Sequence, residues 1–279
     1  MIYRELAPAP PLRPYVRCYW TLSAAAPTDP APQRILPDGC VEIVLNLGAA
    51  FLRHDTAGKI ERQPWALVVG PTTRHLSISP TGVTRLVGIR FLPGGAYPFL
   101  PVPPSEMRDT APSLLDVAPR FPDGLLERLA DAKPGSESQI LDQALGARLA
   151  RARRLTDRRV LASVHATYAA QHPLRVDALV ALTGIGARQI ERAFRQAVGY
   201  GPKTLCRLAR FQRVVRALSP SIRPSWARLA AQNGYADQSH LAREFRQYAG
   251  TTLMTYVREL HPMSDRFHAA PVVDELPID

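Results

Sequence analysis

The strongest constraint on the fold of this chain is an internal repeat in its second half. Residues 176–199 read VDALVALTGIGARQIERAFRQAVG, and residues 226–250 read WARLAAQNGYADQSHLAREFRQYAG. Each copy predicts a short helix, a glycine turn and a longer helix, and the second copy has one extra residue in its turn. This order is typical of a helix-turn-helix unit, in which the second helix enters the major groove of DNA.

A long helix is predicted between the two copies, over the segment PKTLCRLARFQRVVRAL. Its apolar residues recur at helical spacing and form one stripe: Leu205, Leu208, Phe211, Val215 and Leu218. A helix of about 17 residues spans about 25 Å. We therefore expect a rigid spacer that holds the two units apart.

The longer helix of the second copy has an inward and an outward face. Asp237 stands where an N-cap belongs, and Leu241, Phe245 and Tyr248 are spaced to face the domain core. The outward side chains near the helix start are suited to base edges: Gln238, Ser239, His240 and Arg243. Arg246 lies one turn further along, where contact with a phosphate is expected.

The longer helix of the first copy predicts a matching outward set: Arg188, Gln189, Glu191, Arg192 and Arg195. Glu191 is the only carboxylate in this set. It either accepts from a cytosine amino group or pairs with Arg188 or Arg195 on the helix surface, and the surface pair is favoured.

The charge of the chain is concentrated in the region of the repeat. The formal net charge is +11. Residues 1–150 hold 15 basic and 14 acidic side chains, residues 151–262 hold 19 and 6, and the last 17 residues hold 1 and 4. Arginine-rich composition alone would not leave acidic residues scarce in one region only. This asymmetry predicts a polyanionic partner for residues 151–262.

Together, the two copies and their spacer resemble the DNA-binding domain of AraC/XylS-type transcription regulators over roughly residues 160–260. The segment GYADQSHLAREFRQYAG is similar to the signature of that family. By matching position, the resemblance places the base-facing residues at 188, 191, 192 and 195 and at 238, 239, 240 and 243. The chain departs from the family at Gly186, where a capping Ser is common, and at Leu253, where a Pro is usual.

The N-terminal half resembles the sensor half of some members of the same family. The stretches LRPYVRCYW, ILPDGCVEIVLNLG and VGIRFLPGGAYPF carry this likeness. It implies an effector-binding domain, and hence a small-molecule partner besides double-stranded DNA. A second copy of the chain and RNA polymerase are further partners that we expect from the family.

The fold class predicted is α+β and multidomain. Residues 1–104 contain short β-like runs between Pro and Gly turns and predict a small β-barrel, cupin-like domain or sandwich. Residues 105–157 predict helices that pack on this domain, on a partner subunit or on both. Residues 158–262 predict the all-helical tandem domain, and residues 263–279 an acidic, flexible tail.

Within the β-domain, VEIVLNL alternates apolar residues with Glu42, Val44 and Asn46. One face of this strand is core, and the other is either solvated or lines a cavity. The candidate cavity residues are Trp20, Arg34, Glu42, Asn46, Trp65 and Arg90.

The same residues give no pattern for catalysis, for a metal or for a cofactor. His54 and His75 stand apart, and the sequence has no GxSxG, HExxH or phosphate-binding glycine loop. Cys40 is the only candidate nucleophile or redox sensor, so the alternative hypothesis is an enzyme or Cys-based damage-responsive protein fused to a DNA-binding module. Three scattered cysteines and the lack of an apolar span or secretory leader predict a cytoplasmic protein without a membrane partner.

Overall fold

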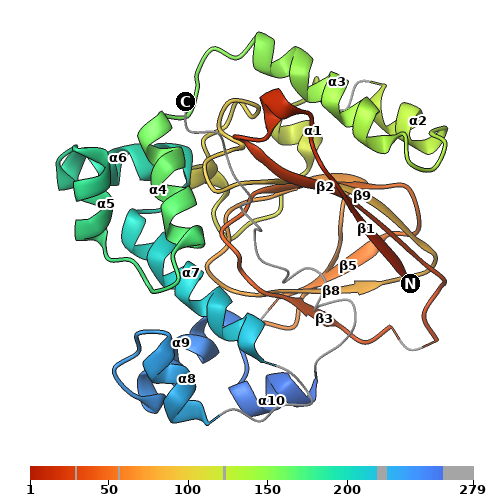
Figure 1. The fold of residues 1–279 in the computed structure, drawn as a ribbon. Coiled ribbons are helices and arrows are strands. Elements are labelled where there is room, and N and C mark those ends of the chain that lie inside the picture. Colours follow the sequence, from red (N-terminus) through yellow and green to blue (C-terminus); the bar gives the residue numbers. More distant parts are fainter. Residues whose placement is uncertain (29, 56, 122–123, 219–224, 260–279) are drawn as a thin grey trace.

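The computed structural model describes all residues except 29, 56, 122–123, 219–224 and 260–279. The described chain has a β-rich N-terminal region, helices that cover it and a helical C-terminal region (Figure 1). The predicted α+β, multidomain fold is confirmed. The tail predicted for residues 263–279 lies outside the described residues.

The N-terminal region is built from two antiparallel sheets that do not close into one barrel. The five-stranded sheet has the order β1-β2-β9-β4-β7, and the four-stranded sheet has the order β3-β8-β5-β6. The first contains β1 (Ile2–Leu6), β2 (Val16–Ala24), β9 (Thr84–Phe91), β4 (Glu42–Asn46) and β7 (Ala66–Val69). The second contains β3 (Gln33–Ile35), β8 (Leu76–Pro80), β5 (Phe51–His54) and β6 (Ile60–Arg62).

The five-stranded sheet separates two layers, because successive side chains of a strand point to opposite faces. On β4, Ile43 and Leu45 are fully buried in the larger core of this region. Glu42, Val44 and Asn46 point the other way, toward the four-stranded sheet. Of the two alternatives for this second face, a cavity is the one that the structure contains.

Helices α1 (Leu114–Val117), α2 (Leu125–Ala130) and α3 (Glu137–Ala150) cover the outer face of the five-stranded sheet (Figure 1). Their leucines, among them Leu114 and Leu141, share one core with Ile43. The helices predicted for residues 105–157 therefore pack on the β-domain. Two single turns of 3-10 helix, η1 (Pro10–Leu12) and η2 (Pro104–Met107), complete this region.

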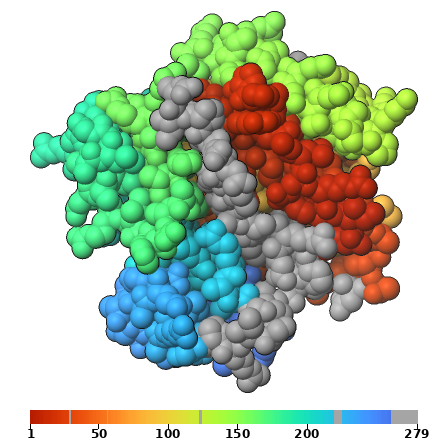
Figure 2. Space-filling view, in the orientation of Figure 1, coloured from red at the N-terminus to blue at the C-terminus, as the bar shows by residue number. Residues whose placement is uncertain are grey.

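The C-terminal region is a bundle of helices with two helix-turn-helix units, and it lies to one side of the N-terminal strands (Figure 2). The first unit is α5 (Val176–Thr183) and α6 (Ala187–Ala197), and the second is α8 (Trp226–Gln232) and α9 (Gln238–Ala249). Helix α7 (Pro202–Ala217) joins them, while α4 (Arg158–Ala169) and α10 (Leu253–Arg258) flank them. The apolar stripe predicted on the spacer is buried along α7. Both copies of the repeat thus have the predicted arrangement. Among the described residues, no helix combines the length and the apolar character that a membrane span requires.

Candidate DNA-binding surface and ligand pocket

Helix α9 begins at a capped N-terminus, as the sequence predicts. The Asp237 side chain accepts a hydrogen bond from the backbone N–H of His240, with an O···N distance of 2.6 Å. Leu241, Phe245 and Tyr248 are buried in the core of the bundle. The cap fixes where the helix starts, and the buried stripe fixes which face is turned outward.

The outward face of α9 is exposed at four of the five predicted positions: Gln238, Ser239, Arg243 and Arg246. His240 is half-buried. Its ring lies edge-on to Tyr235, with 5.2 Å between ring centroids, and its Nδ1 accepts from the backbone N–H of Ala236. His240 therefore packs against the turn that precedes α9.

Glu244 is a carboxylate on α9 that points inward, and the sequence analysis did not single it out. It is 4% exposed and accepts hydrogen bonds from Arg207 (2.8 Å) and from Arg210 (2.7 and 2.8 Å), both on α7. Burial alone would raise the pKa of Glu244, but the hydrogen bonds from the two guanidinium groups outweigh burial and lower it. This ionic cluster joins the second recognition helix to the spacer. Glu244 lies more than 30 residues from both arginines in the sequence, so no local sequence pattern indicated this cluster.

Helix α6 carries the corresponding surface of the first unit. Arg188, Gln189, Arg192 and Arg195 are exposed. Glu191 accepts from Arg195 Nε at 2.9 Å, which is the surface pair favoured from the sequence. Gly186 precedes the helix and provides no side-chain cap, so this helix start lacks the hydrogen bond that Asp237 gives to α9.

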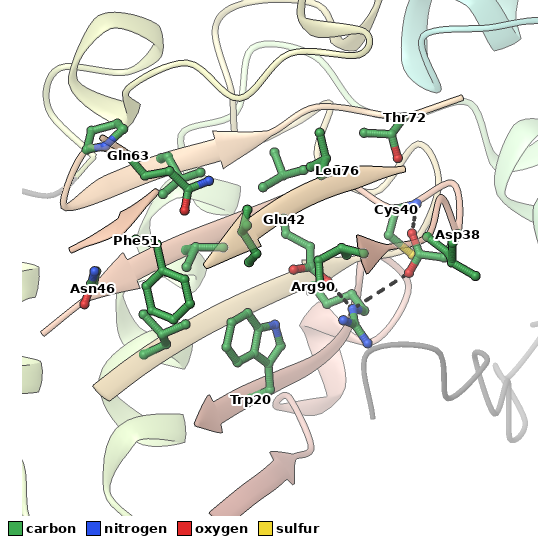
Figure 3. Close-up of a pocket in the computed structure, with 18 residues that line it drawn as sticks. Trp20, Asp38, Cys40, Glu42, Asn46, Phe51, Gln63, Thr72, Leu76 and Arg90 are labelled. Carbon is green, nitrogen blue, oxygen red and sulfur yellow. Dashed lines mark hydrogen bonds and ion pairs between the residues drawn. The ribbon is translucent and has the colours of Figure 1, made fainter. Parts of the chain in front are cut away.

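A pocket lies between the two sheets of the N-terminal region (Figure 3). Its walls are strand residues from both sheets and residues of the adjoining loops. The five-stranded sheet contributes Trp20, Glu42, Val44, Asn46, Leu67, Val69, Leu86 and Arg90. The four-stranded sheet contributes Ile35, Phe51, Leu76 and Ile78, and loops contribute Leu36, Asp38, Cys40, Gln63, Pro64 and Thr72. An apolar cavity with a few convergent polar groups is typical of a small-molecule site.

One end of the pocket is ionic. Arg90, only 1% exposed, pairs with Glu42, and its Nε lies 3.9 Å from Asp38 Oδ2 (Figure 3). On its other side, Arg90 Nη1 lies 4.0 Å from a carboxylate oxygen of Glu5. Burial raises the pKa of Glu42, although Arg90 opposes the rise. A buried, paired guanidinium beside two carboxylates gives this end a defined set of polar partners for a ligand.

Away from this end the pocket is mostly apolar, and an aromatic side chain shapes its wall. The indole ring of Trp20 lies over Gly88 of the neighbouring strand β9. A Cβ at position 88 would lie 2.0 Å from Trp20 Cε2, so only glycine permits this approach. Phe51 and Asn46 lie toward the end of the pocket away from Asp38 (Figure 3).

The structure brings four of the six candidate cavity residues together around this pocket: Trp20, Glu42, Asn46 and Arg90. Arg34 does not line it, because its side chain extends to an ion pair with Glu259. Trp65 is 49% exposed, with the guanidinium of Arg62 5.5 Å from its ring centroid. Asp38, Phe51 and Gln63 also line the pocket and were not singled out. The turn PDG just before Cys40 was the available signal for Asp38.

Cys40 faces the ionic end of the pocket and is 4% exposed. Burial, together with the nearby Asp38 carboxylate, raises the pKa of its thiol well above the ordinary value. The thiol is therefore protonated at neutral pH, a state in which cysteine is a poor nucleophile. In the part of the chain that the structure describes, no cluster of three or more His, Cys, Asp or Glu side chains is arranged to hold a metal ion.

Comparison with known families finds one match in each half of the chain. Residues 179–259 match a family described as a helix-turn-helix domain, and residues 4–113 match a domain of unknown function, DUF6597. The C-terminal region thus contains a helix-turn-helix domain, as the repeat predicts. No curated protein sequence matches the chain.

Among solved structures, the chain is similar to ToxT from Vibrio cholerae. The structure at 1.65 Å resolution shares 9% sequence identity, over 86% of this chain and 98% of that chain, with a TM-score of 0.47. The structure of unsaturated fatty acid bound wild-type ToxT from Vibrio cholerae strain SCE256 also shares 9% identity, over 86% and 94%, with a TM-score of 0.40. Likeness at this level does not extend to a shared ligand.

Proposed function

We propose that this protein is a transcription regulator that binds double-stranded DNA sequence-specifically and responds to a small molecule held between its two β-sheets. Recognition helices α6 and α9 enter the major groove, and α7 sets the distance between them. The protein acts in the cytoplasm, with RNA polymerase and a second copy of the chain as protein partners. The pocket acts as a sensor and not as a catalytic site.

The observation that carries this proposal is the pair of exposed helix faces on a tandem helix-turn-helix domain. On α9 the exposed residues include Gln238, Ser239, Arg243 and Arg246. The one carboxylate between them, Glu244, is turned inward. Guanidinium and amide side chains suit base edges, and arginines further along a helix suit phosphates. A face without free carboxylates avoids repulsion of the DNA backbone.

The sensor part of the proposal is supported by the pocket. It has apolar walls, one aromatic side chain packed directly on a backbone glycine, and charged groups only at one end. Its only thiol is buried and protonated, which speaks against covalent chemistry with an added agent. Reversible ligand binding is the function that such a cavity supports best.

Selection of DNA by the full chain tests the proposal. The purified protein is incubated with a pool of random duplexes, and bound duplexes are enriched and sequenced. We expect a defined motif with two half-sites and a dissociation constant that rises steeply with salt concentration, as phosphate contacts require. Enrichment of no motif, together with equal affinity for enriched and scrambled duplexes at physiological salt, would show that the protein is not a sequence-specific regulator.

Two further measurements address the remaining parts. Mass determination in solution, with and without the enriched duplex, decides whether two copies act together. A thermal-shift screen of small molecules against the full chain tests the sensor, and intact mass after incubation distinguishes reversible binding from covalent change at Cys40.

A further inference from the structure

Residues 36–40, here called the linking segment, lie between the pocket and the DNA-binding region. On one side, the side chains of Leu36, Asp38 and Cys40 line the pocket. On the other side, Leu36 belongs to the same core cluster as the helices of the tandem domain. The segment is therefore a part of the pocket wall that is in direct contact with the DNA-binding region.

Three consecutive carbonyl groups of the linking segment are held by side chains of that region. Gln212 Nε2, on α7, donates to the carbonyl of Pro37 at 2.7 Å. Tyr168, on α4, donates to the carbonyl of Asp38 at 2.7 Å. Tyr200, between α6 and α7, donates to the carbonyl of Gly39 at 3.3 Å. Burial raises the pKa of both tyrosines, so each hydroxyl retains the proton that it donates.

The fit at this contact is close. Gly39 has φ +85°, and a Cβ there would lie 2.6 Å from Tyr200 Oη and 2.7 Å from Tyr168 Oη. Packed interfaces of this kind shift between discrete arrangements and do not deform gradually. A displacement of the linking segment must therefore be followed by α4 and α7 or must break their hydrogen bonds.

Asp38 is the charged residue of this segment that lines the pocket. Its Oδ1 accepts from the backbone N–H of Cys40 at 2.9 Å, and its Oδ2 lies 3.9 Å from Arg90 Nε. Arg90 is already paired with Glu42, so the carboxylate of Asp38 has only a longer ionic contact with it.

The charge at this end of the pocket favours a cationic group. The lining residues contribute two carboxylates, from Asp38 and Glu42, and one guanidinium, from Arg90. When Glu5 and Arg17, which also act on this cluster, are counted as well, one negative charge is in excess among these five described side chains. A ligand ammonium group beside Asp38 would offset this excess, whereas a ligand carboxylate would have to compete with Glu42 for Arg90.

Resting on the proposed function, we propose that the linking segment transmits occupancy of the pocket to the DNA-binding region. The ligands that act through this segment have an apolar, aromatic body and a cationic head that donates hydrogen bonds. The body lies against Trp20 and Phe51. The head binds Asp38, and the movement of Asp38 is passed through the three carbonyls to α4 and α7.

The ligand class is tested with a matched pair of probes, 2-(1-naphthyl)ethylamine and 1-naphthylacetate, by thermal shift of the full chain. The amine should raise the midpoint of unfolding and the acid should not. In Asp38→Asn the effect of the amine should disappear, whereas Trp65→Ala, outside the pocket, should retain it. An equal shift with the acid, a shift that survives in Asp38→Asn, or no shift with either probe would overturn the assignment.

The transmission is tested by combining the amine with removal of the two hydroxyl groups. In the wild-type chain the amine should change amide hydrogen exchange of α4 and α7, and should change the dissociation constant for the enriched duplex about fivefold or more. In the double variant Tyr168→Phe, Tyr200→Phe the amine should still bind, but both changes should be lost. Tyr19→Phe is the matched control, because its hydroxyl donates to Asp142 at 2.8 Å, away from the tandem domain.

The outcomes separate this inference from the proposed function. If the amine binds but alters neither exchange nor affinity in the wild-type chain, or alters them equally in the double variant, the linking segment does not transmit. If the chain enriches no duplex, the proposed function fails, and hydrogen exchange alone still decides whether the pocket is coupled to α4 and α7.

Discussion

Arg243 and Arg246 are both exposed on α9, and they lie almost one helical turn apart. Arg243 is nearer the N-terminus of the helix, where recognition helices contact base edges. Arg246 is further along, where the helix leaves the groove and phosphates are within reach. We therefore expect Arg243 to contribute to sequence recognition and Arg246 to binding of DNA of any sequence.

We predict that Arg243→Ala weakens binding to the cognate duplex by about 1–3 kcal/mol and relaxes preference at one or two base pairs. Arg246→Ala should weaken binding to all duplexes alike and lower the salt-dependence slope by about one unit. Titrations on cognate and scrambled duplexes at several salt concentrations measure both effects. Equal losses on both duplexes for Arg243→Ala would contradict the assignment of this residue to base reading. Arg192 and Arg195 should show the same contrast on α6.

A second residue-scale prediction concerns Glu244, whose pKa is lowered by Arg210 and Arg207 despite burial. Because the pKa of Glu244 is lowered, its ionised form stabilises the folded state. This stabilisation is complete above the pKa of about 4.5 in the unfolded chain, and it is lost as pH falls through the lower pKa of the folded state. Glu244→Gln should therefore lower the free energy of unfolding by about 2 kcal/mol at pH 7. The difference from wild type should shrink as pH falls below about 4.5.

Urea unfolding of both proteins across this pH range measures the effect of Glu244→Gln. Glu191→Gln is the matched control, because Glu191 also pairs with an arginine but on the exposed surface of α6. That variant should cost about 0.5 kcal/mol or less. A loss for Glu244→Gln that does not change with pH would show that its packing, and not its charge, matters.

At the scale of secondary-structure elements, the two recognition helices differ in how they begin. Helix α9 has the Asp237 cap, whereas Gly186 offers α6 none. A Cβ at position 186 would meet no atom within 4 Å, so a serine has room there. We predict that Gly186→Ser raises the free energy of unfolding by a few tenths of a kcal/mol, and that Asp237→Ala lowers it by about 1 kcal/mol. Chemical denaturation of the two variants measures both changes in the free energy of unfolding. A lower free energy of unfolding in Gly186→Ser would show that a serine does not cap α6.

The helix ends supply a second element-scale prediction. Gly184 ends α5 and Gly250 ends α9, and both have φ +66°. At position 184 a Cβ would meet nothing within 4 Å, but at position 250 it would lie 2.1 Å from Cε1 of His75. The backbone N–H of His75 donates to the carbonyl of Tyr248 at 2.9 Å, so the obstructing ring belongs to a residue held against α9.

Gly184→Ala should cost about 1 kcal/mol, which is the strain of a left-handed backbone. Gly250→Ala should cost at least about 1 kcal/mol more, because the His75 ring must also move. Thermal unfolding ranks the two variants. Equal midpoints would show that His75 moves aside freely and that this contact between the β-domain and α9 contributes little.

At the scale of the whole molecule, the tandem domain has its own core but is not independent of the rest. That core includes Leu36 and Tyr97 from the N-terminal region. The hydroxyl of Tyr97 accepts from Gln196 of α6 at 2.6 Å. A fragment without residues 1–157 would expose the side chains that these contacts cover.

We predict that a fragment of residues 158–262 folds and binds DNA, with a lower unfolding midpoint than the full chain. Residues 1–155 should fold but not bind, since basic and acidic side chains nearly balance over residues 1–150 and only three further arginines follow. Circular dichroism on heating and DNA titration at physiological salt test both statements. Equal DNA affinity of the two fragments would contradict the assignment of DNA binding to residues 158–262. Truncation after Met263, which lies outside the described residues, should leave folding and DNA binding unchanged.

Local sequence determined the second half of this protein. Helix period, the Asp237 cap and the glycine turns act within a few residues of one another, so the repeat predicts both helix-turn-helix units and the outward face of each recognition helix. The same holds for β2, β4 and β9, because their apolar runs are long enough to indicate strands from the sequence. Alternation along β4 also placed Glu42 and Asn46 on a face that could line a cavity.

Only the tertiary structure decided what those faces meet. The short strands of the second sheet gave no comparable pattern, and without them neither Phe51 nor the pocket itself could be placed. Trp65 and Arg34 have the right residue types for a ligand site but lie outside it, whereas Asp38 lies inside it. The ion pairs of Glu244 with α7, and the hydrogen bond from Tyr168 to the carbonyl of Asp38, join residues that are far apart in the chain. Such contacts depend on how whole elements pack, and no spacing within a single element encodes that packing.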